Sequence, residues 1–167
     1  MTLETVVLAG GCFWGMQDLV RNLPGVKNTR AGYAGGSLQN PTYKDVCTGK
    51  TGHAEAVFIE FDADQLSLRK LLEFFFQIHD PTTVDRQGND RGSQYRSAIF
   101  ARNDDQAQTA KALIKELDDA GIWPSKIVTQ IEPGAEFFPA EESHQDYLVK
   151  FPEGYTCHFV RPDWKIG

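Results

Sequence analysis

The order of periodic segments in this sequence, strand, helix, strand, strand, helix, strand, predicts an α/β (α+β) fold with a ferredoxin-like split βαβ core. The prediction adds one further helix, one further strand and long irregular loops. The length of 167 residues is about that of one domain, and the sequence contains no internal repeat or linker. We therefore expect residues 1–167 to form a single domain, with an irregular C-terminal tail from about residue 151.

Short connections join the first three elements. Residues 5–9 are an apolar run that predicts a buried strand. The glycine pair 10–11 makes a tight turn before a helix over about 12–22, which Pro24 and Gly25 end. Residues 26–33 predict the second strand. Cys12 is therefore expected at or near a helix N-terminus.

A glycine-rich loop, GGSLQNPTYKDVCTGKTG, follows and is too long for a hairpin turn, as loops with a function often are. Residues 54–61 give the clearest strand, because Glu55 alternates onto one face with three apolar side chains. Residues 67–78 carry leucine and phenylalanine at helical spacing. This stripe predicts a helix that packs on the core.

A second irregular loop, HDPTTVDRQGNDRGSQYRS, leads into a strand over about 95–101. Asn103 with Gln106 is a capping-box pattern, and the helix that it opens runs to about Asp119, before Gly121. The remaining predicted elements are a strand over 126–132 and a short helix over 140–149.

Composition indicates a soluble cytoplasmic protein. The net charge of -6 and the pI near 5.2 argue against nonspecific nucleic-acid binding, which needs clustered Lys and Arg. No apolar run approaches the roughly 20 residues that cross a bilayer. The opening residues MTLETVVLAGG have neither the basic region nor the cleavage site of a targeting signal. We expect no membrane association.

The chain has three cysteines, and their wide spacing fits neither a secreted disulfide framework nor a zinc site. Cys12 at a helix N-terminus is placed for a lowered pKa and nucleophilic reactivity, or else is a small buried hydrophobic residue. A mobile tail could bring Cys157 to Cys12 as a second sulfur. Cys47 could do the same or be an inert packed thiol.

Two further features allow both a functional and a structural interpretation. Phe13 and Trp14 either belong to the core or form the wall of a small apolar pocket for a methyl group beside Cys12. Glu55 either is buried with a raised pKa and acts as a general acid, or lies solvated or paired with an Arg at a strand end.

Polar residues of the two irregular loops also allow both a functional and a structural interpretation. Tyr43, Asp90 and Tyr95 either donate or relay hydrogen bonds to a substrate oxygen or make ordinary structural ones. Metal ligation is not expected, because no HExxH motif or cysteine pair accompanies the scattered histidines, which are His53, His79, His144 and His158. No phosphate-binding glycine motif occurs, so we expect no nucleotide cofactor.

Five blocks of this sequence closely resemble the peptide methionine sulfoxide reductase A family, in the same order and over about residues 6–160. These blocks are rich in Cys, Trp, Tyr and His. They are GCFWG at 11–15, GYAGG at 32–36, PTYKDVCTGKTGHAEA at 41–56, HDPTTVDRQGNDRGSQYRS at 79–97 and AEESHQDYL at 140–148.

The resemblance implies roles for individual residues. The cysteine of GCFWG is the family's nucleophile, which implies this role for Cys12. The aromatic residues of that motif hold the substrate's S-methyl group, implying Phe13 and Trp14. The glutamate of GHAE protonates the sulfoxide oxygen, implying Glu55. Residues that help to bind or polarise the substrate are implied to be Tyr43, Asp90 and Tyr95.

The resemblance also implies a reaction cycle that repairs oxidised protein. Attack by Cys12 on the sulfur of methionine sulfoxide releases methionine and leaves a sulfenic acid, which Cys157 resolves into a disulfide. Thioredoxin then reduces the disulfide. The substrate is the S epimer, free or within a protein, no cofactor is implied, and a monomer is the simplest expectation.

The sequence departs from the family's common pattern at two places. Many members have two C-terminal cysteines, whereas this chain has only Cys157, so it resembles the type with one resolving cysteine. Many members have glutamate at the position of Gln17, which is not a catalytic position. The resemblance gives Cys47 no catalytic role.

Two other functions are compatible with a reactive Cys12. One is a cysteine hydrolase or acyltransferase, which needs an activating histidine such as His53 or His144. The other is a noncatalytic thiol redox sensor that forms a disulfide with peroxide and releases no methionine.

Overall fold

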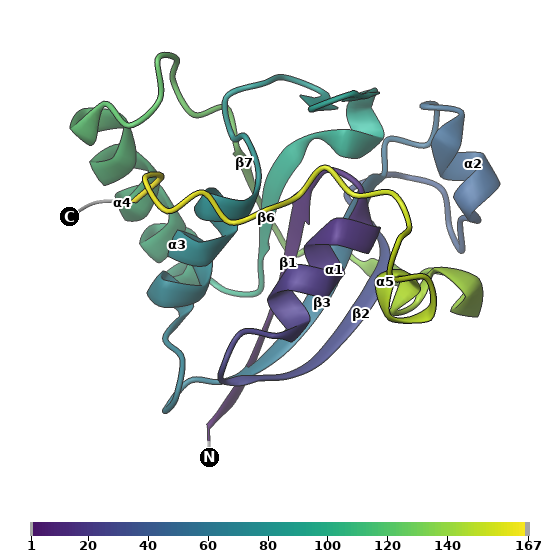
Figure 1. Ribbon diagram of the computed structural model, residues 1–167, viewed down its shortest axis with the longest axis horizontal. Coiled ribbons are helices and arrows are strands. Elements are labelled where there is room, and N and C mark those ends of the chain that lie inside the picture. The colour runs from purple at the N-terminus through teal and green to yellow at the C-terminus, as the bar shows by residue number, and fades with distance from the viewer. Residues whose placement is uncertain (1, 166–167) are drawn as a thin grey trace.

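In the computed structural model, which describes residues 2–165, a six-stranded sheet runs in the order β7-β6-β1-β3-β2-β8 (Figure 1). Its strands are β1 (Leu3–Gly10), β2 (Val26–Ala34), β3 (Ala54–Asp62), β6 (Ser97–Ala101), β7 (Gln130–Pro133) and β8 (Phe137–Pro139). A separate two-stranded ribbon consists of β4 (Arg86–Gln87) and β5 (Asp90–Arg91).

Helices follow most of the strands. The α-helices are α1 (Phe13–Arg21), α2 (Tyr43–Cys47), α3 (Leu68–Ile78), α4 (Asp104–Ala120) and α5 (Tyr147–Lys150). Two 3₁₀ turns are η1 (Ser93–Tyr95) and η2 (Glu142–His144).

The four central strands form the predicted ferredoxin-like core. Strand β1 pairs antiparallel with both β3 and β6, and β2 pairs antiparallel with β3. Strands β1 and β2 therefore run in the same direction on either side of β3, which is the split βαβ arrangement. The added strand β7 lies parallel to β6, and β8 extends the other edge beside β2. The predicted fold class is confirmed.

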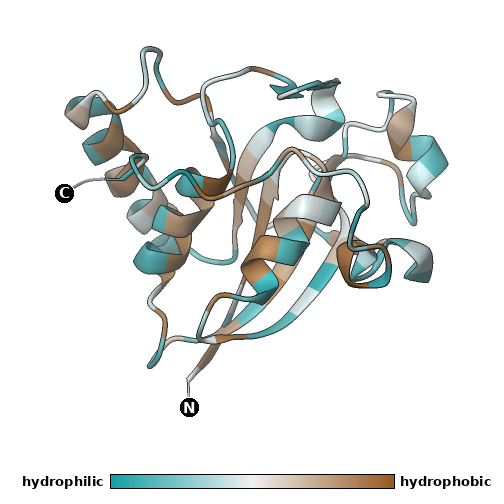
Figure 2. Cartoon of the chain, viewed as in Figure 1, coloured by the Kyte–Doolittle hydropathy of each residue, from teal (hydrophilic) through white to brown (hydrophobic). Residues whose placement is uncertain are grey.

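The main hydrophobic core lies between one face of this sheet and the helices α1, α3 and α4. Figure 2 shows hydrophobic and hydrophilic residues on different sides of α1 and α3, as expected for helices that pack on a core. On β3 the buried face carries Val57, Ile59 and Phe61 together with Glu55. The expected alternation of β3 is confirmed, and it places a carboxyl group inside the protein.

Helix α4 begins and ends where the sequence indicates. The Asn103 side chain accepts a hydrogen bond from the Gln106 N–H at 2.9 Å. The Gln106 side chain turns back one residue further than in a standard capping box, because its Oε1 accepts from the Arg102 N–H at 2.9 Å. Gly121 ends the helix in the left-handed region, at φ 64°.

The predicted single helix over residues 140–149 is wrong. Its residues form η2 and α5, separated by Gln145 and by Asp146, which has a positive φ of 51°. The cause is a side-chain bridge: Gln145 accepts from the Ala31 N–H at 2.8 Å and donates to the Ala31 carbonyl at 2.7 Å. Because Gln145 is bonded to β2 in this way, the helix does not continue from η2 into α5.

Other differences concern element boundaries and short elements. The strand predicted over 95–101 begins at Ser97, because η1 occupies the preceding residues. The strand predicted over 126–132 is the shorter β7. The elements of residues 2–165 that were not predicted are α2, β4, β5, η1 and β8.

We predict that Asn103→Ala lowers the free energy of unfolding by about 1 kcal/mol, because the first N–H groups of α4 lose their side-chain acceptor. Urea unfolding measures the change. Asn28→Ala, which alters an exposed asparagine, is the matched control. Equal stability of the two variants would contradict the capping role.

Candidate active site

Cys12 lies at the corner between β1 and α1. Gly10 ends the strand, Gly11 has a positive φ of 98° that favours glycine, and Cys12 is the N-cap residue of α1. Its carbonyl accepts a hydrogen bond from the Met16 N–H at 3.4 Å. Cys12 is only 7% exposed. The predicted position at a helix N-terminus is confirmed.

Of the two interpretations of Cys12, burial dominates over a lowered pKa. Burial raises the pKa of this thiol well above its ordinary value, and negative charge on Glu55 acts in the same direction. A hydrogen bond from the Trp14 backbone N–H lowers the pKa but is the smaller effect. The helix terminus therefore does not outweigh burial, and the Cys12 thiol is protonated at neutral pH.

Glu55 projects from β3 toward the start of α1 and is 1% exposed. Its Oε1 accepts a hydrogen bond from the Phe13 N–H at 3.2 Å, whereas its buried Oε2 has no partner among residues 2–165. Burial raises the Glu55 pKa to about 8, against the opposing effect of the Phe13 N–H, and the charge of Asp90 adds to the increase. The carboxyl is thus mostly protonated at neutral pH, which favours the buried interpretation of Glu55 over the solvated one.

Aromatic side chains from three segments gather at the first turn of α1, and we call Phe13, Trp14, Tyr43, His144 and Tyr147 the aromatic cluster. Trp14 stacks on Tyr147 with ring centroids 3.8 Å apart and donates its indole N–H to His144 Nδ1 at 3.1 Å. The Tyr43 ring lies 4.2 Å from that of His144. Phe13 is fully buried within the core, while Trp14 is partly exposed.

Glu141 holds Tyr43 in this cluster. One carboxylate oxygen accepts from the Tyr43 N–H at 3.0 Å, and the other accepts from the Tyr33 hydroxyl at 2.9 Å. Burial raises the pKa of Tyr43, so its hydroxyl remains a donor at neutral pH.

Asp90 lies beside the second predicted sulfur. Its Oδ2 accepts from the Tyr155 hydroxyl at 3.1 Å and lies 3.9 Å from Cys157 Sγ. Burial raises the pKa of Asp90 and also that of Cys157. The pKa of Tyr95 is raised by burial and then by the charge of Glu55. Asp90 and Cys157 also contribute to the raised pKa of Cys12, so they act within the same electrostatic environment.

No hydrogen bond within residues 2–165 joins a histidine ring to the Cys12 thiol. His53 is engaged at both nitrogens, accepting from the Gly36 N–H at 3.0 Å and donating to the Leu38 carbonyl at 2.7 Å. His144 Nδ1 accepts from Trp14. The geometry therefore does not favour the hydrolase alternative, in which one of these histidines activates Cys12.

The described part of the chain has no group of three or more His, Cys, Asp and Glu side chains that could hold a metal ion. None of the helices formed by residues 2–165 has the length and apolar character that crossing a membrane requires.

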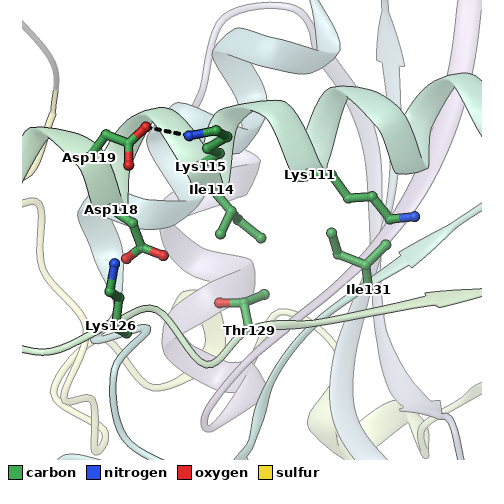
Figure 3. Close-up of a pocket in the computed structure, with 8 residues that line it drawn as sticks. All are labelled: Lys111, Ile114, Lys115, Asp118, Asp119, Lys126, Thr129 and Ile131. Atoms are coloured by element: carbon green, nitrogen blue, oxygen red, sulfur yellow. Dashed lines mark hydrogen bonds and ion pairs between the residues drawn. The ribbon is translucent and has the colours of Figure 1, made fainter.

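An open groove of about 480 Å³ lies between α4 and the segment leading into β7 (Figure 3). Its lysines and aspartates include the ion pair of Lys115 and Asp119, with 2.7 Å between Nζ and Oδ2. None of the eight residues that line it belongs to the constellation around Cys12.

Several residues to which the sequence assigned no role complete the site, namely Tyr33, Glu141, Tyr147, Tyr155 and His158. Glu141 and Tyr147 lie in the block AEESHQDYL, and Tyr155 and His158 flank Cys157. Their closeness to recognised residues was the available signal.

A ferredoxin-like fold with a buried thiol just after β1, a protonated carboxyl group on β3 and a second free thiol in the C-terminal tail fits the class of thiol-based oxidoreductases. The family model described as "Peptide methionine sulfoxide reductase" matches residues 4–165. The chain belongs to the peptide methionine sulfoxide reductase family.

Curated relatives and solved structures agree with this assignment. Peptide methionine sulfoxide reductase MsrA of Nocardia farcinica is 58% identical over 160 residues, which cover 96% of this chain and 92% of the relative. Mxr1 of Saccharomyces cerevisiae in reduced form matches with a TM-score of 0.85 and 38% identity, covering 95% of this chain and 92% of Mxr1. Mxr1 in complex with Trx2 matches with a TM-score of 0.59 and 28% identity, covering 95% and 90%.

We predict that Glu55→Gln stabilises the protein increasingly as pH rises from about 4 to 8. In the wild type, the unfolded carboxyl ionises near 4.5 and the folded one only near 8, so stability is lost across this window by up to about 5 kcal/mol. The Gln variant lacks this loss. Urea unfolding of both proteins across this range measures the difference.

Glu60→Gln is the matched control, because it removes a carboxyl group from the same strand outside the site. A constant stability difference between Glu55→Gln and the wild type at every pH would contradict the buried, protonated state of Glu55.

Proposed function

We propose that this protein is a thioredoxin-dependent peptide-methionine (S)-S-oxide reductase that repairs oxidised methionine. The observation that carries the proposal is the protonated Glu55 carboxyl, with one free oxygen, at the helix terminus that bears Cys12. A sulfoxide needs a nucleophile at its sulfur and a proton at its oxygen. Cys12 and Glu55 supply these two groups.

In the first step, Cys12 sulfur attacks the sulfoxide sulfur while Glu55 gives its proton to the sulfoxide oxygen. Glu55 regains a proton from the Cys12 thiol, so S–H and S=O become a Cys12 sulfenic acid and methionine without net proton uptake. The high pKa of Cys12 fits this exchange, because the thiol keeps its proton until the substrate oxygen takes the one on Glu55.

Substrate orientation comes from the residues around this pair. Trp14, which is partly exposed, offers apolar surface to the S-methyl group, and the buried Phe13 supports this wall through its ring contacts with Tyr43 and His144. The polar groups that bind or polarise the sulfoxide are those of Tyr43, Asp90 and Tyr95. Because methyl group, oxygen and attacking sulfur are fixed together, one configuration at sulfur is accepted. The resemblance to the peptide methionine sulfoxide reductase A family assigns the S epimer as this substrate.

The second step converts the Cys12 sulfenic acid into a disulfide that an external dithiol can reduce. Cys157 attacks the sulfenic acid, forms a disulfide with Cys12 and releases water. Thioredoxin reduces this disulfide by thiol–disulfide exchange. The Mxr1 neighbour in complex with Trx2 supports a reductant of this kind.

The substrate is methionine sulfoxide in proteins and as the free amino acid, and the reaction needs no cofactor. The chain acts as a single-domain monomer in the cytoplasm, where thioredoxin keeps disulfides reduced and where the protein limits damage from oxidative stress.

We predict that the reduced protein, without another reductant, releases about one methionine per chain from the S diastereomer of a methionine sulfoxide peptide and none from the R form. The intact protein then loses two hydrogens, mapped to Cys12 and Cys157. Chromatography of methionine and intact mass spectrometry give both numbers.

Substitutions distinguish the role of Cys12 from that of Cys157. Cys12→Ser abolishes methionine release, whereas Cys157→Ser still releases about one equivalent but does not turn over with thioredoxin. Methionine release by Cys12→Ser, or none by the wild type with either diastereomer, would refute the proposed activity and favour the sensor or hydrolase alternatives.

We predict that the single-turnover rate of methionine release falls as pH rises through about 8, because the Glu55 carboxyl loses the proton that it transfers. Glu55→Gln lowers the rate by about 10²–10⁴-fold and removes this pH limb. Rapid quench across pH measures both effects. An unchanged pH limb in Glu55→Gln would assign the titration to another group.

A further inference from the structure

His158 is buried although it lies in a tail that forms no helix or strand over residues 151–165. Its Nε2 lies 2.7 Å from the Gly10 carbonyl oxygen. Because a carbonyl only accepts, Nε2 carries the proton and donates, which leaves Nδ1 of the neutral ring as an acceptor. The ring therefore attaches the tail to the backbone two residues before Cys12.

The first turn of α1 leaves room for this ring. A Cβ at Gly15 would overlap both His158 Nδ1 and Thr156 Oγ1, and a Cβ at Gly11 would come within 3.3 Å of His158 Nε2. Figure 1 shows the yellow tail passing over the start of α1. The two glycines and the histidine thus form one fitted contact between the tail and the Cys12 corner.

A second attachment lies on the other side of Cys157. Tyr155 donates its hydroxyl hydrogen to Asp90 at 3.1 Å. Between the two attachments, Cys157 Sγ lies 3.9 Å from Asp90 Oδ2 and 3.9 Å from His158 Nδ1. Of the two attachments, only the one at His158 joins the Cys157 segment directly to the strand and turn that carry Cys12.

We propose that His158 is a positioning residue for disulfide formation, which holds Cys157 at the Cys12 corner through its hydrogen bond to Gly10 and its fit against Gly15. This inference rests on the proposed function and specifies its second step. Removal of the ring takes away the attachment next to Cys157 and leaves the tail held at Tyr155 on one side and, on the other, at Arg161, whose N–H donates to the Gln77 carbonyl at 2.9 Å. Cys157 then visits the Cys12 sulfenic acid less often.

The chemistry of the step is balanced within the protein. The S–O bond of the Cys12 sulfenic acid breaks and a bond to Cys157 sulfur forms, so Cys12 sulfur is reduced and Cys157 sulfur is oxidised. The Cys157 thiol proton leaves with the hydroxide as water. Asp90 Oδ2 and His158 Nδ1, both 3.9 Å from Sγ, are acceptors that relay this proton.

The test is a single turnover of the reduced full chain with the S diastereomer, followed by rapid quench. Methionine release reports the first step, and intact mass with a sulfenic-acid trap reports the second. We expect His158→Ala to lower the ratio of the disulfide rate to the methionine rate at least tenfold, with trapped sulfenic acid accumulating on Cys12.

Two further variants distinguish positioning from general stability. His158→Gln restores most of the ratio, because its side-chain amide reaches the Gly10 carbonyl, and it also serves if His158→Ala does not fold. Val160→Ala alters an exposed residue of the same tail and leaves both rates unchanged. A ratio unaffected in His158→Ala, or both steps slowed equally without rescue by Gln, would overturn the proposal.

Disulfide formation after one equivalent of hydrogen peroxide makes the test independent of reductase activity. Peroxide oxidises the Cys12 thiol to the sulfenic acid and is itself reduced to water. The rate of disulfide formation is then compared among the same variants. Slow closure in His158→Ala with rescue by Gln supports positioning even if no diastereomer gives methionine. Equal closure rates contradict it.

Discussion

One hydrogen bond, from the Phe13 N–H to Oε1 of Glu55, underlies the arrangement of the whole site. It gives an otherwise unpaired amide at the start of α1 a partner from β3, and so fixes the helix terminus against the sheet. It also engages only one oxygen of a buried carboxyl, which burial keeps protonated and which therefore presents a donor at the other. The position of α1 and the capacity of Glu55 to donate a proton thus both depend on this one hydrogen bond.

The sequence is informative where a local pattern coincides with the tertiary environment. The alternation of β3 places Glu55 on the buried face, and Asn103 with Gly121 delimits α4, because these signals depend on near neighbours. The turn before Cys12 is equally local, since the glycine pair permits it. Family motifs then identify residues that the structure brings together from distant parts of the chain.

Other features depend on contacts that no local pattern contains. The break between η2 and α5 results from Gln145 bridging to Ala31, which is 114 positions away. Glu141 reaches Tyr33 and Tyr43 in the same manner. The choice between the two interpretations of Cys12 also depends on such contacts, because the helix terminus is visible in the sequence whereas the degree of burial is set by the assembled fold.

The contact of the tail with the Cys12 corner has a consequence for the protein during its synthesis. Cys12 leaves the ribosome 145 positions before Cys157, and the segment around Glu141 and His144 also emerges late. Strand β1, which leads to Cys12, must itself wait for β3 and β6 to pair. The nascent chain therefore carries the Cys12 thiol without the neighbouring groups until the segments that hold Glu141, His144 and His158 have been made.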